Sequence, residues 1–225
     1  MALLLNLETA TTNCSVSLAT NGESIAIKQL NTPNYSHSEQ LHLFIAQVLE
    51  EAGKVMNDLD AIAVSKGPGS YTGLRIGVSA AKGLCYALDK PLISIPTLES
   101  MAYQCQEKGV DFVIPLLDAR RMEVYSAVFD ATGGQVRETL AEIIDINSFE
   151  RYATKGTVLL AGSGAEKCRA ILTSEKFSFD TDIVPSALEM SALSFQKFQK
   201  KDFEDVAYFE PYYLKDFMLH TKQKK

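Results

Sequence analysis

Hydrophobic and polar positions over the first thirty residues alternate as in a three-stranded meander. Residues 2–7 form an apolar run, and the apolar Cys14, Val16 and Leu18 alternate with small or polar side chains. A period of two is typical of a strand that buries one face. The pair Asn21-Gly22 then predicts a two-residue hairpin turn, because both residues tolerate positive φ. A third strand is expected over about residues 24–30.

Helical spacing begins near residue 36. Apolar side chains recur there every three or four positions, which predicts one buried helix face; they are Leu41, Phe44, Ile45, Val48, Leu49 and Ala52. Ser36 and Glu39 predict a capping box at the start of this helix, and Gly53 is expected to end it.

Shorter segments complete the first half of the chain. A buried strand over residues 61–65 leads into a glycine-rich loop at 66–73, which opens a second helix reaching about residue 88. A strand at 92–95 and a helix from Thr97 follow. The predicted order is therefore β-β-β-α-β-α-β-α.

The second half of the chain resembles a copy of the first. Strands are expected at 112–117 and 123–129, at about 135–139 and 142–146, and at 158–161; a last long helix begins at Ser186. In both halves the first strand ends in an acidic residue, Glu8 or Asp118, and a later strand leads through a glycine loop into a helix.

This duplication of β-β-β-α-β-α units predicts an α/β protein with the actin-like ATPase (ASKHA, ribonuclease H-like) fold. The expected lobes are residues 1–108 and a smaller lobe, 109–225, whose last segment can pack back on the first. A doubly wound sheet is the alternative that alternating helices and strands leave open.

Composition narrows the class of protein. The chain has 225 residues, of which 46% are hydrophobic and 22% charged, as in folded globular proteins. The apolar N-terminal run is too short for a membrane span or a signal sequence, so a cytoplasmic location without a membrane partner is expected. The net charge of −6 argues against nucleic-acid binding by this chain alone. Its clearest basic cluster, Lys222, Lys224 and Lys225, reads as a solvated tail.

The acidic strand ends and the glycine loops form one candidate binding site. In an actin-like fold these segments face a cleft between the lobes, where a helix N-terminus attracts phosphate and a carboxylate can hold Mg²⁺. The candidate cofactor-binding residues are Glu8, Gly67, Gly69, Asp118, Gly162 and Gly164. Neither loop matches a Walker A or Rossmann motif, so tight turns in a vestigial cleft are the alternative interpretation.

Metal and hydrolase chemistry find little support in the sequence. His37 and His42 are five positions apart and so leave a common helix face, and His220 lies in the polar tail. Ser70 and Ser163 follow glycines but lack a G-x-S-x-G motif. The four cysteines are far apart and read as buried thiols. No catalytic residue and no metal ligand is therefore assigned.

A stripe of small residues marks the helix after the first glycine loop. Gly73, Gly77 and Ala81 recur every four residues, and each glycine inside a helix costs about 1 kcal/mol relative to alanine. Close packing explains such a stripe, either against the sheet of this chain or against another subunit. We expect a partner interface formed with the helix at 38–52; its candidate residues are Leu41, Phe44, Ile45, Val48, Gly73, Gly77, Ala80, Ala81 and Leu84. On this view Gly77→Leu weakens partner binding and leaves the chain folded.

Four stretches carry a resemblance to a known family. They are residues 5–17 (LNLETATTNCSVS), 66–77 (KGPGSYTGLRIG), 118–125 (DARRMEVY) and 210–215 (EPYYLK). Through them the sequence resembles the TsaB family, also called YeaZ, nearly from end to end. Glu8 departs from the family pattern, which usually has Asp there.

The resemblance implies an actin-like fold and a role in making threonylcarbamoyladenosine on tRNA. It implies pairing with the catalytic paralogue TsaD, recruitment of the ATPase TsaE, homodimers when the partner is missing, and only indirect contact with tRNA. It also places the family interface on helices at about 36–52 and 72–88. No cofactor is required, although ATP or ADP with Mg²⁺ at or near the interface stays open.

The resemblance further implies that this chain is not the enzyme. The catalytic paralogue carries an H-M-E-G-H metal motif where this sequence reads Thr97-Leu98-Glu99-Ser100-Met101. Both imidazoles are replaced, and one carboxylate does not replace them. The expectation is a non-catalytic scaffold subunit. An ATP-hydrolysing enzyme of the same fold and a glycoprotease-like peptidase remain as alternatives.

Overall fold

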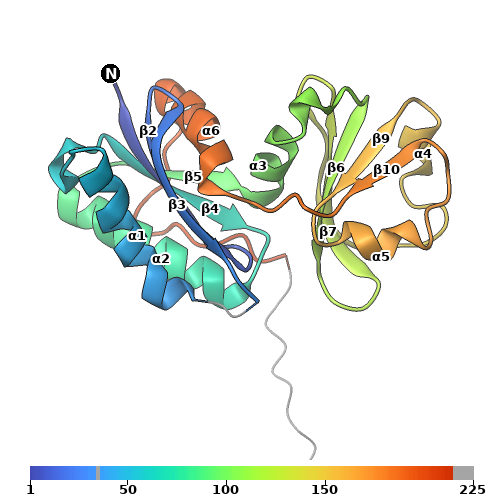
Figure 1. Ribbon diagram of the computed structural model, residues 1–225, viewed down its shortest axis with the longest axis horizontal. Helices are drawn as coiled ribbons and strands as arrows, with labels where there is room; N and C mark the ends of the chain where they lie inside the picture. The colour runs from blue at the N-terminus through green and yellow to red at the C-terminus, as the bar shows by residue number, and fades with distance from the viewer. Residues whose placement is uncertain (34–35, 215–225) are drawn as a thin grey trace, which may run out of the picture.

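The protein consists of two lobes, each built on a five-stranded sheet (Figure 1). The structure is a computed structural model that describes residues 1–33 and 36–214. The basic cluster at Lys222, Lys224 and Lys225, together with His220 and the last residue of the 210–215 motif, lies outside the described residues.

The first sheet has the strand order β3-β2-β1-β4-β5. Its strands are β1 (Leu3–Glu8), β2 (Asn13–Thr20), β3 (Glu23–Asn31), β4 (Ala61–Gly67) and β5 (Leu92–Pro96). β1 pairs with β2, and β2 with β3, in antiparallel fashion, as the Asn21-Gly22 turn predicts, whereas β4 and β5 continue the sheet in parallel.

The second sheet repeats this plan in the order β8-β7-β6-β9-β10. Its strands are β6 (Phe112–Asp118), β7 (Glu123–Asp130), β8 (Gln135–Ile143), β9 (Val158–Ala161) and β10 (Phe177–Asp180). Antiparallel pairing of β6, β7 and β8 and parallel pairing of β6, β9 and β10 reproduce the directions of the first sheet. Two sheets with one connectivity confirm the duplicated actin-like α/β fold and exclude the single doubly wound sheet.

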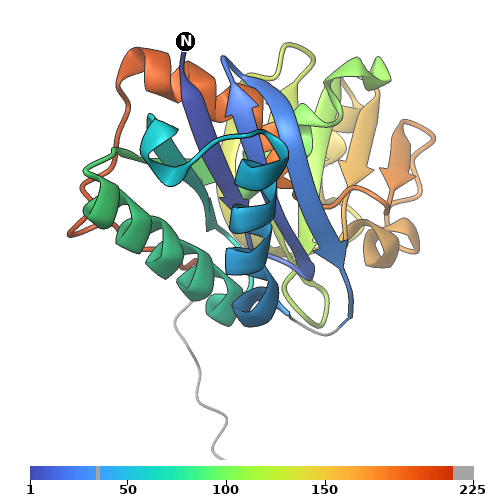
Figure 2. The same ribbon diagram turned by 60° about the vertical axis from the view of Figure 1, so that its left-hand side comes forward.

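The helices form three layers around the two sheets (Figures 1 and 2). α1 and α2 cover the outer face of the first sheet, α3 and α6 lie between the sheets, and α4 and α5 belong to the second lobe. Their bounds are α1 (His37–Glu51), α2 (Tyr71–Leu88), α3 (Thr97–Tyr103), α4 (Glu150–Ala153), α5 (Ala165–Arg169) and α6 (Ala187–Lys200). Single 3₁₀ turns occur at Met56–Asp58 and Gln106–Lys108.

The last helix of each half packs against the sheet of the other half. α3 follows the first sheet in sequence, yet its Leu98, Met101 and Ala102 lie in a core with residues of β6, β7 and β9. α6 follows the second sheet and places Met190 and Leu193 against the inner face of the first. This exchange joins the lobes through buried apolar area rather than through a flexible linker.

Two local predictions differ from the structure. Residues 135–143 form one strand, with register irregularities opposite Ser126 and Val128, instead of two short ones, because pairing with β7 continues through the bulges. At the start of α1, Ser36 makes no side-chain cap hydrogen bond; its backbone carbonyl accepts from the Glu39 N–H instead.

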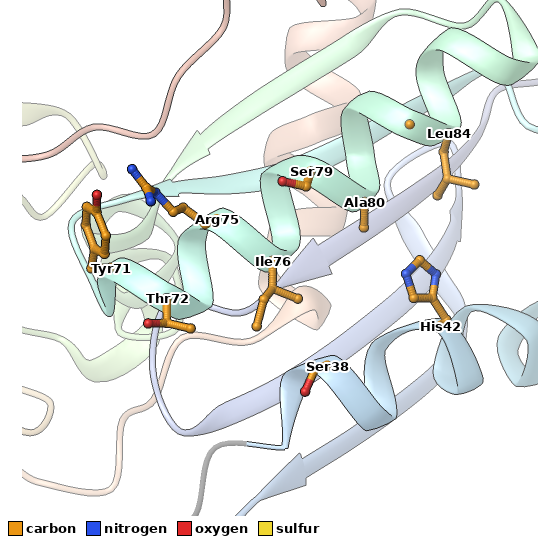
Figure 3. Close-up of a pocket in the computed structure, with 10 residues that line it drawn as sticks. Ser38, His42, Tyr71, Thr72, Arg75, Ile76, Ser79, Ala80 and Leu84 are labelled. Atoms are coloured by element: carbon orange, nitrogen blue, oxygen red, sulfur yellow. The ribbon is translucent and has the colours of Figure 1, made fainter.

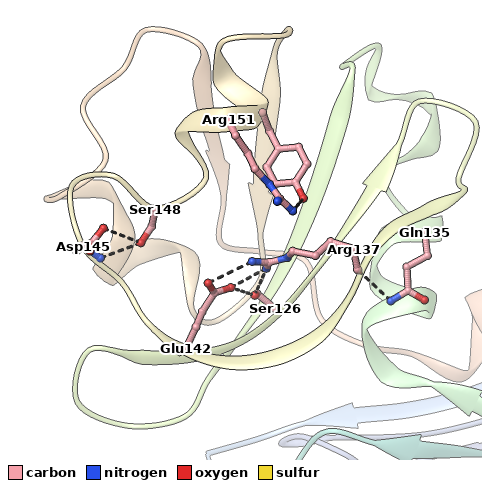
Figure 4. A network of polar contacts seen from close by, with 8 residues as sticks. Ser126, Gln135, Arg137, Glu142, Asp145, Ser148 and Arg151 are labelled. Carbon is pink, nitrogen blue, oxygen red and sulfur yellow. Dashed lines mark hydrogen bonds and ion pairs between the residues drawn. The ribbon is translucent and has the colours of Figure 1, made fainter.

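A partly buried ion pair stabilises the edge of the second lobe (Figure 4). Arg137 Nη2 of β8 donates to Glu142 Oε1 at 2.6 Å and to Ser126 Oγ at 2.5 Å, and Ser126 also donates to Glu142. The guanidinium lies over the Phe149 ring. Every partner belongs to the same lobe, so this network holds the β8 edge to the rest of the second lobe.

No helix among residues 1–33 and 36–214 is long and apolar enough to cross a membrane.

Candidate functional site

The end of β1 places an acidic side chain at the inner face of the first sheet. Glu8 is fully buried, and its Oε1 accepts from the Ala10 N–H at 2.6 Å and from the Ser65 hydroxyl at 2.8 Å. Its Oε2 has no hydrogen-bond partner within the described chain. Burial raises the pKa of Glu8 to about 7, which the hydrogen bonds only partly oppose, and nearby Glu189 raises it further.

Other polar atoms without partners lie on the same side of the sheet. Thr97 Oγ1, at the start of α3, and Glu189 Oε2, in the first turn of α6, are both buried and without a partner in the described structure. Burial also raises the pKa of Glu189. Burial therefore disfavours the charged forms of both Glu8 and Glu189.

The first glycine loop is filled by its own chain. A Cβ atom on Gly69 would lie 2.5 Å from the Ala10 carbonyl oxygen, and one on Gly73 would lie 2.1 Å from the carbonyl oxygen of Thr9. A Cβ on Gly77 would lie 2.2 Å from Thr9 Oγ1, which itself donates to the Gly73 carbonyl at 2.8 Å. These glycines thus permit α2 to contact the β1–β2 connection.

Two N–H groups at the start of α2 are also engaged within the chain. The Ser70 N–H donates to the Ala10 carbonyl at 2.6 Å, and the Gly73 N–H donates to Ser70 Oγ. A phosphate at this helix end would need those donors.

The second glycine loop packs inward in the same way. A Cβ on Gly162 would lie 2.3 Å from Met101 Cε, and one on Gly164 would lie 2.9 Å from the Leu116 Cβ. The Gly162 N–H donates to the Asp180 carbonyl, and the Gly164 N–H to the Leu116 carbonyl. Close packing of α3 and β6 therefore explains both glycines.

Asp118 carries its own counter-ion. Lys167 Nζ lies 2.7 Å from Asp118 Oδ1, and the Arg120 N–H donates to the same oxygen. Partial burial would raise the pKa of Asp118, but the hydrogen bonds from Lys167 and Arg120 lower it. Ser163 Oγ accepts a hydrogen bond from the Asp118 N–H, so the serine stabilises the end of β6.

The candidate cofactor residues therefore do not fit a Mg²⁺–nucleotide. Glu8 is buried and its pKa is raised, Asp118 is paired with a lysine, and the glycines of both loops contact protein atoms. The space beside Gly67 is occupied as well, since the Tyr212 carbonyl oxygen lies 2.8 Å from the position that a Cβ on Gly67 would take. The structure supports tight internal packing as the role of these loops.

The segment aligned with the metal motif of the catalytic paralogue starts α3. Thr97 and Met101 are fully buried, and Met101 belongs to the core beneath the second sheet. Burial raises the pKa of Glu99, against the influence of Lys197, Lys66 and Lys200. Within the described residues no group of three or more His, Cys, Asp or Glu side chains could hold a metal ion.

A groove lies open between α1 and α2 on the first lobe (Figure 3). Its volume is about 730 Å³. Ile76, Ala80 and Leu84 point from α2 toward α1, while Tyr71 and Arg75 lie together at the first turn of α2. The lining residues are Ser38, His42, Tyr71, Thr72, Arg75, Ile76, Ser79, Ala80, Gly83 and Leu84.

Only two of the predicted interface residues line this groove, namely Ala80 and Leu84. The other seven are buried in the first lobe: Leu41, Phe44, Ile45, Val48, Gly73, Gly77 and Ala81. Their side chains pack on the sheet or the β1–β2 connection and present no surface to a partner. The expectation for Gly77→Leu is corrected accordingly, because the new side chain would collide with Thr9 and destabilise the fold.

The sequence reasoning missed the exposed side of the same helices. Thr72, Arg75 and Ser79 of α2 and Ser38 and His42 of α1 recur at helical spacing on the polar side. The available signal was the polar stripe beside the apolar one. His37 is buried, and its Nε2 lies 2.7 Å from the Thr11 carbonyl oxygen.

Comparisons with known proteins agree with this architecture. A family model described as TsaD, tRNA N6-adenosine threonylcarbamoyltransferase, matches residues 32–222. The Haemophilus influenzae tRNA threonylcarbamoyladenosine biosynthesis protein TsaB is 38% identical over 54% of this chain and 51% of its own length. The Escherichia coli protein of the same name is 30% identical over 97% of both chains.

A solved structure, YeaZ from Pseudomonas aeruginosa, superimposes with a TM-score of 0.84. It is 26% identical, and the match covers 95% of this chain and 100% of that one. Full-length agreement in sequence and in fold, together with the TsaD-type model, leads to one assignment: the chain belongs to the TsaB (YeaZ) family of tRNA threonylcarbamoyladenosine biosynthesis proteins.

Proposed function

We propose that this chain is a non-catalytic scaffold subunit in the synthesis of threonylcarbamoyladenosine on tRNA. It binds and activates a TsaD-type transferase through the α1–α2 face, helps to recruit the ATPase TsaE, and forms a homodimer when the transferase is absent. It contacts tRNA only indirectly and requires no cofactor of its own.

The observation that carries this proposal is the groove between α1 and α2. Both helices bury one face in the lobe, yet Ile76, Ala80 and Leu84 remain partly exposed along the opening. Small side chains at Ser79, Ala80 and Gly83 let another helix approach closely, and an apolar strip in a groove is typical of helix recognition.

The chemistry of the cleft supports a non-catalytic role. A transferase site of the paralogue type needs accessible metal ligands, whereas Thr97 and Met101 are buried and Met101 is a core residue. The glycine loops, which would serve an ATP-hydrolysing enzyme, are occupied by Thr9, Ala10 and Leu116.

The peptidase alternative would need Ser70 or Ser163 as its nucleophile. Ser70 Oγ accepts from the Gly73 N–H as a helix cap, and Ser163 Oγ accepts from the Asp118 N–H. Both hydroxyls therefore hold backbone N–H groups of their own lobe, which gives the peptidase alternative no support.

The first test measures activity with purified components. The chain alone is expected to show no tRNA modification, no ATP turnover and no ATP binding by calorimetry with Mg²⁺, and to increase modification when added to the transferase. Modification of tRNA or ATP turnover by the isolated chain would overturn the proposal, as would a transferase equally active without it.

Ala80→Arg is expected to weaken transferase binding by about 2 kcal/mol, or about thirtyfold in affinity. The new side chain would fill the centre of the groove, while Ala80 is only partly buried, so the fold should tolerate it. Calorimetric titration of purified variant and transferase measures the change.

The matched control is Ala170→Arg, the same replacement at an exposed position after α5 in the second lobe. It should bind like the unmodified protein. Thermal denaturation checks that both variants are folded. Equal affinity of the two folded variants for the transferase would show that the groove is not the binding face.

A further inference from the structure

The chain after α6 crosses back over the first lobe as a strap, defined here as residues 203–214. The Glu204 N–H donates to the Leu92 carbonyl of β5 at 2.9 Å, and Ser94 Oγ donates to the Glu204 carboxylate. Further along, Lys82 Nζ of α2 donates to the carbonyls of Ala207 and Phe209, both at 3.0 Å. The strap is thus fixed to β5 and α2 at several points.

A last anchor lies at the first glycine loop. The Tyr212 N–H donates to the Lys66 carbonyl at 2.7 Å. Gly67 has a φ of +108°, and the Tyr212 carbonyl oxygen occupies the space that a Cβ would need. Residue 67 must therefore be glycine for the strap to pass, and this passage delivers Tyr213 in a fixed position.

Tyr213 meets two groove residues at the first turn of α2. Its ring centroid lies 5.0 Å from that of Tyr71, and its hydroxyl oxygen accepts from Arg75 Nε at 3.2 Å. The Arg75 guanidinium also lies over the Tyr71 ring, 4.1 Å from its centroid. We call Tyr71, Arg75 and Tyr213 the arginine platform. Two aromatic rings restrain a side chain that would otherwise sample many rotamers.

Tyr71 and Tyr213 hold Arg75 but leave the terminal edge of its guanidinium group available to a ligand. Only Nε is used by Tyr213, and Arg75 takes part in none of the ion pairs found in the described part of the chain. The hydrogen bond to Tyr213 raises the pKa of Arg75, and the field of Glu210 adds to it. Arg75 is exposed at the rim of the groove, next to the apolar strip.

We propose that the arginine platform binds a carboxylate side chain of the partner, and that the strap, through Tyr213, holds Arg75 ready for it. This inference rests on the proposed function, because the partner is the transferase docked in the α1–α2 groove. Tyr213 acts here as a positioning residue, and Arg75 makes the contact.

Charge and shape favour a carboxylate over a phosphate. The chain carries a net charge of −6, which repels a polyanion such as RNA, whereas a single acidic side chain on an amphipathic helix meets one arginine. A guanidinium edge binds a carboxylate through two parallel hydrogen bonds.

The test is a double-mutant cycle on transferase binding. Calorimetric titration at low and at high salt measures the affinity of each variant. Arg75→Gln should weaken binding about thirtyfold and remove most of its salt dependence. Tyr213→Phe keeps the ring and loses only the hydroxyl, and should weaken binding about tenfold. The double variant should bind no more weakly than Arg75→Gln alone, since Tyr213 acts through Arg75. Tyr208→Phe, at an exposed tyrosine of the same strap, is the matched control and should bind normally.

The outcomes separate this inference from the proposed function. Normal affinity of Arg75→Gln, additive losses in the double variant, or unchanged salt dependence would overturn the platform while leaving groove binding intact. Loss of tRNA binding in Arg75→Gln with unchanged transferase affinity would assign the arginine to RNA and also overturn it. If the unmodified chain does not bind the transferase at all, the proposed function fails together with this inference.

Discussion

Replacing Gly73 by alanine is expected to lower the free energy of unfolding by about 3 kcal/mol, at the upper end of overpacking costs. The added Cβ would lie 2.1 Å from the carbonyl oxygen of Thr9, which is backbone and cannot rotate away. Relief requires α2 and the β1–β2 connection to separate, and that separation would also stretch the bond from Thr9 Oγ1 to the Gly73 carbonyl. Urea denaturation followed by circular dichroism measures the loss.

Gly83→Ala provides the control on the same helix. No atom lies within 4 Å of a Cβ at Gly83, and the position is exposed, so helix propensity should dominate. A gain of about 1 kcal/mol is expected. If Gly73→Ala were as stable as Gly83→Ala, the tight packing of α2 on Thr9 would be wrong, and the glycine stripe would need another explanation.

Part of the architecture was predictable from local sequence spacing. The period-two pattern and the Asn21-Gly22 turn placed β1, β2 and β3, because local spacing determines strand faces and turn type. The repetition of an acidic strand end and a glycine loop in each half revealed the duplication. The exchange of α3 and α6 between the lobes left no local signal, since an apolar helix face looks the same whichever sheet it covers.

The candidate site was less predictable for a related reason. Gly73 and Gly77 were recognised as close-packing residues, but sequence spacing alone does not distinguish a contact with Thr9 from a contact with another protein. Likewise, the apolar residues of α1 from Leu41 to Val48 were assigned to a partner interface, whereas they pack inside the lobe. Exposure of the opposite stripe, where Arg75 lies, depends on the tertiary arrangement of α1, α2 and the strap.

Stability should decrease as pH rises through the titration of Glu8. The pKa of Glu8 is about 7 in the folded protein against an ordinary value of 4.5, chiefly because burial disfavours the charged form. The folded state therefore holds this proton more tightly than the unfolded state. The contribution to stability is fully present below about pH 4.5 and is lost as pH rises through about 7. At about 1.4 kcal/mol for each pH unit, the loss is about 3 kcal/mol.

Glu8→Gln should remove this dependence, because the amide keeps an oxygen for the Ala10 N–H and the Ser65 hydroxyl and has no proton to lose. Urea denaturation of both proteins at about pH 5 and about pH 8 measures the difference in their pH response. Glu50→Gln, at an exposed glutamate of α1, should leave the response unchanged. A parallel pH response in Glu8→Gln and the unmodified protein would show that Glu8 is ionised in the fold. A negative charge would then remain at the end of β1, whereas loss of the response identifies Glu8 as the group whose buried proton stabilises the fold.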